Sequence, residues 1–79
     1  MSQYDKRYQE FLIRLRAARS EAGLTQEQVA QLLRKPQSYI SKSESGERRI
    51  DIVELTEFAR IYGKPLKYFV ETNWEVPEQ

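Results

Sequence analysis

Glycine and proline divide the 79-residue chain into short segments, with breaks at Gly23, Pro36, Gly46, Gly63 and Pro65. Between these breaks, apolar residues recur at steps of three and four, which is the spacing of one face of an α-helix. No segment shows the strict alternation of a half-buried strand. The sequence therefore predicts an all-α fold, a compact bundle of five short helices.

Residues with helix-capping chemistry predict where these helices begin. Asp5 is placed to cap the first helix, while Thr25 with Gln28 and Asp51 with Glu54 have the spacing of a capping box. A third helix over residues 36–45 can begin at its proline, because the missing N–H costs nothing in a first turn. The glycines end the first, third and fourth helices, and the last proline opens a final short turn.

The apolar stripes predict which residues face inward. They are Tyr8, Phe11, Leu12, Leu15, Ala18 and Ala22 in the first helix, Val29, Ala30, Leu32 and Leu33 in the second, Ile40 in the third, Ile52, Leu55, Phe58, Ala59 and Tyr62 in the fourth, and Leu66, Phe69 and Val70 in the last. We therefore expect one folded domain over residues 1–70. Residues 71–79 read as a short acidic tail with Trp74 as its aromatic anchor.

Composition excludes several classes of function. The chain contains neither cysteine nor histidine, so it lacks disulfides, the usual zinc ligands and the usual general base near neutral pH. Its carboxylates are scattered and no nucleophile–base pair is apparent, so we expect no enzyme, no metal and no cofactor. No apolar run approaches the roughly 20 residues that span a bilayer. We expect a cytoplasmic protein that does not contact membranes.

The charges are unevenly distributed, although the net charge is only +1. Residues 1–49 contain ten Lys or Arg and six Asp or Glu, whereas residues 50–79 contain three and six. The chain is therefore polarised, basic in its first part and acidic in its second. The alternative reading is a chance distribution of charges over solvated helix faces.

The segment RKPQSYISKSESGERR, residues 34–49, has an unusual composition for a surface helix. Serine weakens a helix because its side chain competes for backbone hydrogen bonds. The presence of several serines in this segment therefore needs an explanation other than helix stability. One face would carry Gln37, Ser38, Ser41, Lys42 and Ser45. Glutamine, lysine and serine can bond base edges in the DNA major groove, and Arg48 and Arg49 could meet phosphates. The alternative is a solvent-facing polar helix with incidental serines.

The stretch LTQEQVAQLLRKPQSYISKSESGERR closely resembles the helix-turn-helix of phage-repressor and Cro-like regulators, the XRE family. The motifs GLTQEQVA, PQSYIS and ESGERR occur at the expected spacings, and the resemblance extends from about Leu15 to Phe69. It implies a lambda-repressor-like fold, with the helix-turn-helix formed by the second and third helices.

The resemblance also implies roles for individual residues. Gln37, Ser38 and Lys42 match base-reading positions. Phosphate-contacting or flanking roles fall to Gln26, Tyr39, Ser41, Arg48 and Arg49. Arg19 and Glu44 match an ion pair that ties the first helix to the end of the third.

Three residues depart from the family pattern. Arg34 stands where glycine usually occupies a left-handed turn, and Lys35 replaces a commonly apolar residue. Ser43 replaces an inward Ile, Tyr or Phe, a loss of roughly 1.5–3 kcal/mol of burial. Either Tyr39 or a neighbouring aromatic fills that space, or the third helix is loosely held until DNA binds.

The sequence thus predicts a sequence-specific, repressor-like transcriptional regulator that binds double-stranded DNA. One such domain buries little surface, so we expect a homodimer on a near-palindromic operator. The last helix and the tail around Trp74 could form the dimer surface, or could pack on the domain's own core. The alternative function is a protein-interaction module, such as an antitoxin-like partner or adaptor.

Overall fold

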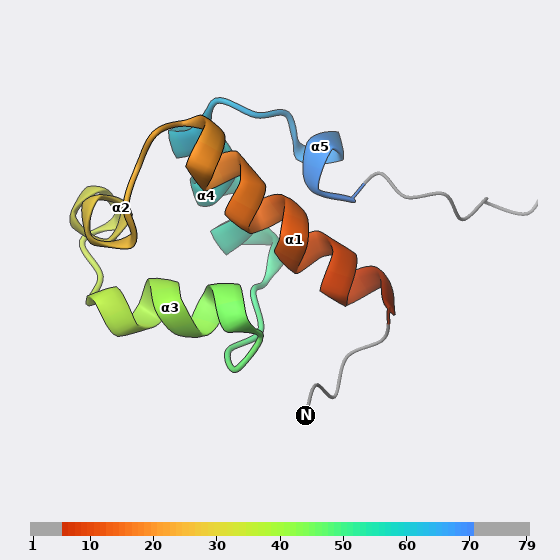
Figure 1. Cartoon of the computed structure of the whole chain (residues 1–79), viewed down its shortest axis with the longest axis horizontal. Coiled ribbons are helices and arrows are strands. Elements are labelled where there is room, and N and C mark those ends of the chain that lie inside the picture. Colours follow the sequence, from red (N-terminus) through yellow and green to blue (C-terminus); the bar gives the residue numbers. More distant parts are fainter. Residues whose placement is uncertain (1–5, 71–79) are drawn as a thin grey trace, which may run out of the picture.

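The computed structural model describes residues 6–70, which form five α-helices and no strand (Figure 1). The helices are α1 (Lys6–Glu21), α2 (Gln26–Leu33), α3 (Gln37–Ser45), α4 (Ile52–Tyr62) and α5 (Leu66–Val70). The all-α prediction is confirmed. Within this range, no helix combines the length and the apolar character needed to cross a membrane.

Local sequence signals set the helix ends. At both capping boxes the side chain and the backbone satisfy each other: Thr25 Oγ1 accepts the Gln28 N–H at 3.1 Å, and Asp51 Oδ1 accepts the Glu54 N–H at 2.8 Å. Left-handed glycines follow α3 and α4, as predicted. The predicted cap Asp5 and the predicted tail with Trp74 lie outside the described residues.

The core draws on all five helices, and most of the predicted inward residues are in it. Its buried apolar members are Phe11, Leu12, Leu15, Ala18, Val29, Ala30, Ile40, Leu55, Phe58, Ala59, Tyr62 and Phe69. These side chains, together with half-buried neighbours such as Tyr8 and Leu33, form a single cluster.

Several residues predicted to face inward are exposed. Leu32 is 59% exposed because it lies roughly 100° around α2 from the centre of the buried stripe. Ala22 is exposed because α1 ends one residue before it, and Ile52, the first residue of α4, is 64% exposed. Leu66 and Val70 of α5 are 40% and 53% exposed, so Phe69 is the one fully buried residue of that helix, and Tyr68 packs against the core half-buried.

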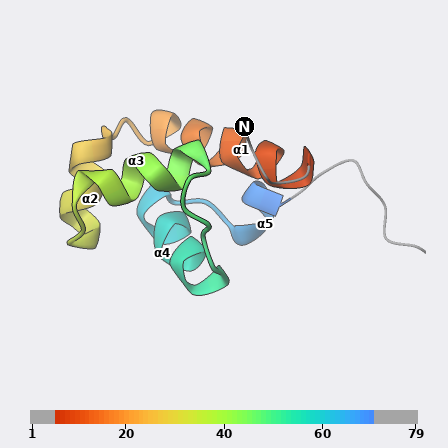
Figure 2. The same ribbon diagram turned by 90° about the horizontal axis from the view of Figure 1, so that it is seen from below.

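The helices are arranged so that α3 has one side on the domain and the other in solvent. Helix α1 crosses the molecule, α2 and α3 pack closely at one end, and α5 contacts α1 at the other (Figure 1). Seen from below, α3 lies between the levels of α1 and α4 (Figure 2). It contacts α1 and α2.

Candidate nucleic-acid interface

Helix α3 presents a continuous polar face to solvent. The five residues predicted to form that face are all exposed: Gln37, Ser38, Ser41, Lys42 and Ser45. On the opposite side, Ile40, Ser43 and Glu44 are buried. The helix therefore separates a polar exposed face from an inner face, as the spacing of its residues predicted.

A buried carboxylate attaches this helix to α1. Glu44 is 2% exposed and forms two bonds with the Arg19 guanidinium, Nε to Oε2 at 2.6 Å and Nη2 to Oε1 at 3.1 Å. The hydrogen bonding of the Arg19 guanidinium to the Glu44 carboxylate raises the pKa of Arg19. The predicted ion pair is thus present in the forked geometry that favours arginine over lysine.

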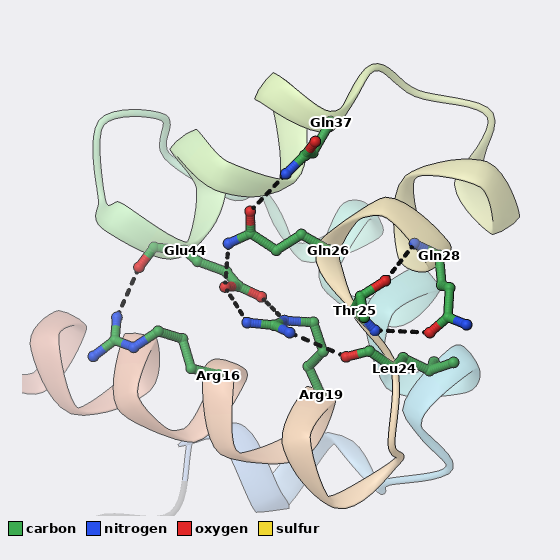
Figure 3. A network of polar contacts seen from close by, with 8 residues as sticks. All are labelled: Arg16, Arg19, Leu24, Thr25, Gln26, Gln28, Gln37 and Glu44. Atoms are coloured by element: carbon green, nitrogen blue, oxygen red, sulfur yellow. Dashed lines mark hydrogen bonds and ion pairs between the residues drawn. The ribbon is translucent and has the colours of Figure 1, made fainter.

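A chain of side-chain amides leads from this ion pair to the exposed face (Figure 3). Gln26, at the start of α2, donates from Nε2 to Glu44 Oε1 at 3.0 Å. Gln37, at the start of α3, donates from Nε2 to Gln26 Oε1 at 3.3 Å. The first exposed residue of α3 is therefore oriented, through one intermediate, by the buried carboxylate.

Two further arginine contacts fix the same region, and the sequence did not predict them. Arg16 donates from Nη1 to the backbone oxygen of Glu44 at 2.8 Å, and Arg19 Nη1 donates to the backbone oxygen of Leu24 at 3.0 Å (Figure 3). Arg16 is thus bonded to the last turn of α3, and Arg19 to the loop that precedes α2. The sequence shows only that Arg16 and Arg19 lie three residues apart on the same side of α1. That spacing does not indicate which backbone oxygens they bond.

The space beside Ser43 is closed by Tyr39 and Arg48. Ser43 is fully buried, and the Tyr39 ring stacks on Phe58 with centroids 6.4 Å apart and planes at 15°. The guanidinium of Arg48 lies 4.1 Å from the Tyr39 ring centroid and donates to Ser43 Oγ at 3.5 Å. With Tyr39 stacked on Phe58 and linked to Ser43 through Arg48, the arrangement favours the first of the two alternatives raised by the sequence, in which Tyr39 or a neighbouring aromatic fills the space.

Arg48 and Arg49 lie close to other side chains of the domain. Arg48 forms a forked ion pair with Glu54, one arm of which joins Nη1 and Oε1 at 3.1 Å, and this pairing raises the pKa of Arg48 and lowers that of Glu54. The Arg49 guanidinium lies 4.6 Å from the Tyr8 ring centroid. Tyr39 is half-buried rather than part of the exposed face.

The turn between α2 and α3 keeps its left-handed residue without glycine. Arg34 has φ 58° and ψ 47°, and the following Lys35 N–H donates to the Ala30 oxygen at 2.9 Å. The Lys35 ammonium lies 5.1 Å from the Tyr39 ring centroid. The turn therefore keeps a left-handed residue at the position where the resemblance led us to expect glycine, with strain at Arg34 of about 1 kcal/mol.

Two short helices joined by a tight turn, the second with a bare polar face, define the helix-turn-helix class of proteins. Comparison with known proteins agrees with this geometry. A family model described as helix-turn-helix matches residues 15–69. A solved structure of an XRE-family like protein from Pseudomonas syringae pv. tomato str. DC3000 has 43% sequence identity and a TM-score of 0.76, covering 82% of this chain and 79% of that chain. No curated protein matches.

The chain belongs to the XRE family of helix-turn-helix proteins. This membership makes it a DNA-binding helix-turn-helix regulator.

Proposed function

We propose that the protein is a sequence-specific, repressor-like regulator that inserts α3 into the major groove of double-stranded DNA. The observation that carries this proposal is the exposed Gln/Ser/Lys face of a helix whose other side is fixed by the Glu44 network. The major groove is wide enough to admit an α-helix. A helix held rigidly by its inner face loses little further conformational freedom when it binds.

The exposed residues divide into base-reading and backbone-contacting groups. Gln37, Ser38 and Lys42 are assigned to base edges, because their side chains supply hydrogen-bond donors or acceptors on the bare face. Ser41 flanks them on the same face. Gln26 lies at the N-terminus of α2, where its amide and the backbone N–H groups can bond a phosphate.

Arg48, Arg49 and Tyr39 are assigned to phosphates, and for Arg48 this assignment requires an exchange of partners. Its guanidinium is paired with Glu54, so a phosphate oxygen must replace or share that carboxylate. The Arg48 pair is partly exposed, with side-chain exposures of 31% and 21%. Such pairs contribute little net stability, so the exchange has a modest energetic cost.

A single α3 helix reads only a few base pairs, and a single domain buries too little surface for tight binding at physiological salt. We therefore propose a two-fold homodimer on a near-palindromic operator, with half-sites about one helical turn apart. The proposed site of action is the bacterial cytoplasm, in a host or phage gene circuit.

The test is to select bound sequences from a random duplex pool and then compare variants on the selected site. Gln37→Ala should relax preference at one or two base positions, each worth about 1–3 kcal/mol of discrimination. Arg48→Ala should instead weaken binding to all DNA similarly and reduce the salt slope by about one. Gln31→Ala removes an exposed glutamine of α2 outside the Glu44 network and should change neither property.

Three results would contradict the proposal. If no sequence is enriched, the protein does not read sequence. If Gln37→Ala selects the same motif as the wild type, as the control Gln31→Ala should, the assignment of Gln37 to base edges is wrong. If duplex DNA is not bound at any salt concentration, the protein-interaction module becomes the better account.

A further inference from the structure

A groove opens at the end of the domain where α1 begins and α5 ends. It has a volume of about 380 Å³, near the lower end of the roughly 300–1,000 Å³ of ligand pockets. Its lining is mainly apolar, with Phe11, Leu55, Phe69 and the exposed Ile52 and Val70 contributing. An exposed apolar surface of this kind usually marks a site that something else covers.

The position of Val70 indicates what that occupant is. Val70 is the last described residue and lines the groove itself, so the segment that follows it begins at the groove's edge. The segment that follows, ETNWEVPEQ, contains the only tryptophan of the sequence. Trp74 lies four positions after Val70, a reach of at most about 14 Å. The indole ring can therefore enter the groove without a long connecting loop.

The charges of the groove and of the segment are complementary. Arg7 and Arg49 both line the groove. Among the described residues, Asp51 is the only acidic residue of the lining, and its carboxylate already accepts the Glu54 N–H as the cap of α4. Residues 71–79 contain three glutamates and no lysine or arginine. An acidic segment with an aromatic centre matches an apolar groove bordered by guanidinium groups.

We propose that residues 71–79 dock in cis into this groove, with the Trp74 indole against the exposed lining side chains of Ile52 and Val70. Docking would cover the exposed side chains of Ile52 and Val70 and extend the single core of the domain. An aromatic side chain that becomes buried removes roughly 150–250 Å² of surface from water. This inference does not depend on DNA binding, and its test requires no DNA.

The test uses the intrinsic fluorescence of Trp74 in the full-length chain. The wild type should emit at shorter wavelength than the same protein in urea and resist quenching by iodide, because the indole is buried. Ile52→Lys places a charge in the groove and should shift the emission toward that of the unfolded chain. Val53→Lys is the matched control, since Val53 is 65% exposed on the same helical turn but does not line the groove.

Circular dichroism melts would establish that each lysine variant is folded, and a dilution series would distinguish docking in cis from docking on a second copy. Emission and quenching should be independent of protein concentration if the segment docks on its own domain. A wild-type spectrum equal to that in urea, or equal spectra for the two lysine variants, would overturn the proposal. Loss of the blue shift on dilution would overturn the cis assignment in favour of a neighbouring copy.

Discussion

At the residue scale, Glu44 determines how α3 is held. Its carboxylate is almost completely buried and depends on Arg19 for its balancing charge and on Gln26 for a third hydrogen bond. Removal of one partner from a buried pair leaves an uncompensated charge, which is far more costly than loss of a surface pair. Through Gln26, the same carboxylate orients Gln37.

We predict that Arg19→Met lowers the free energy of unfolding by about 3 kcal/mol, a large part of the total stability of so small a domain. Urea denaturation monitored by circular dichroism measures the change. Lys64→Met is the control, because it removes an ion pair with Glu21 that lies on the surface and should change stability little. Equal losses in the two variants would show that the Glu44 pair has no special structural role.

Tyr62 is the second residue with a measurable consequence. Its ring is buried against Phe58, and its hydroxyl has no hydrogen-bond partner among the described residues. Burial, and secondarily the negative charge of Glu44, raise the pKa of Tyr62 above its ordinary value of 10.0. The unfolded chain ionises this tyrosine first, so folding stability falls as the pH rises above about 10.

We predict that Tyr62→Phe raises the free energy of unfolding at pH 7 by about 1 kcal/mol, because it removes an unsatisfied buried hydroxyl. The variant should therefore unfold at a higher urea concentration than the wild type. It should also lose less stability than the wild type between pH 9 and about 11. Tyr68→Phe, which alters an exposed hydroxyl near Glu21, should retain the alkaline loss. A lower stability of Tyr62→Phe at pH 7 would mean that the hydroxyl has a partner.

At the scale of the elements, the turn between α2 and α3 is strained at one position. Arg34 adopts a left-handed backbone conformation that is less favourable for every residue with a Cβ and worst for β-branched residues. Glycine removes that strain but increases the entropy of the unfolded chain, so the gain is smaller than the strain itself.

We predict that Arg34→Gly is more stable than the wild type by about 0.5 kcal/mol and that Arg34→Val is less stable than the wild type. Lys35→Gly is the control: Lys35 is exposed and does not have a positive φ, so glycine there should only destabilise. Thermal melts at equal protein concentration give the order. If Arg34→Gly were the less stable protein, contacts of the arginine side chain would outweigh the backbone strain.

The helices could be predicted from the sequence because their determinants are local. Thr25 with Gln28 and Asp51 with Glu54 are three residues apart, so the capping boxes are readable without tertiary information. The partner of Arg48 was not predictable, because Glu54 approaches it only after the chain turns between α3 and α4. The exposure of Ile52 was missed for the same reason: an apolar residue at the edge of a helical stripe is buried only if a neighbouring element covers it.

At the scale of the molecule, the two proposals concern opposite ends of the domain. The α2–α3 end presents the polar face of α3. The inner side of this helix is held by the hydrogen-bond network of Arg19, Glu44 and Gln26, which also bonds Gln37 (Figure 3). The groove lies at the other end, around the start of α1 and the end of α5. The contributions of the two ends to function can therefore be tested separately.

The most direct test of the central claim is methylation interference on the selected DNA site. Dimethyl sulfate modifies guanine N7 in the major groove and adenine N3 in the minor groove. If α3 reads the major groove through its Gln/Ser/Lys face, methylation of guanines within each half-site should abolish binding. Methylation of adenines within the same half-sites should not, because it modifies the minor groove. Interference confined to adenines, or absent at every base, would contradict the account.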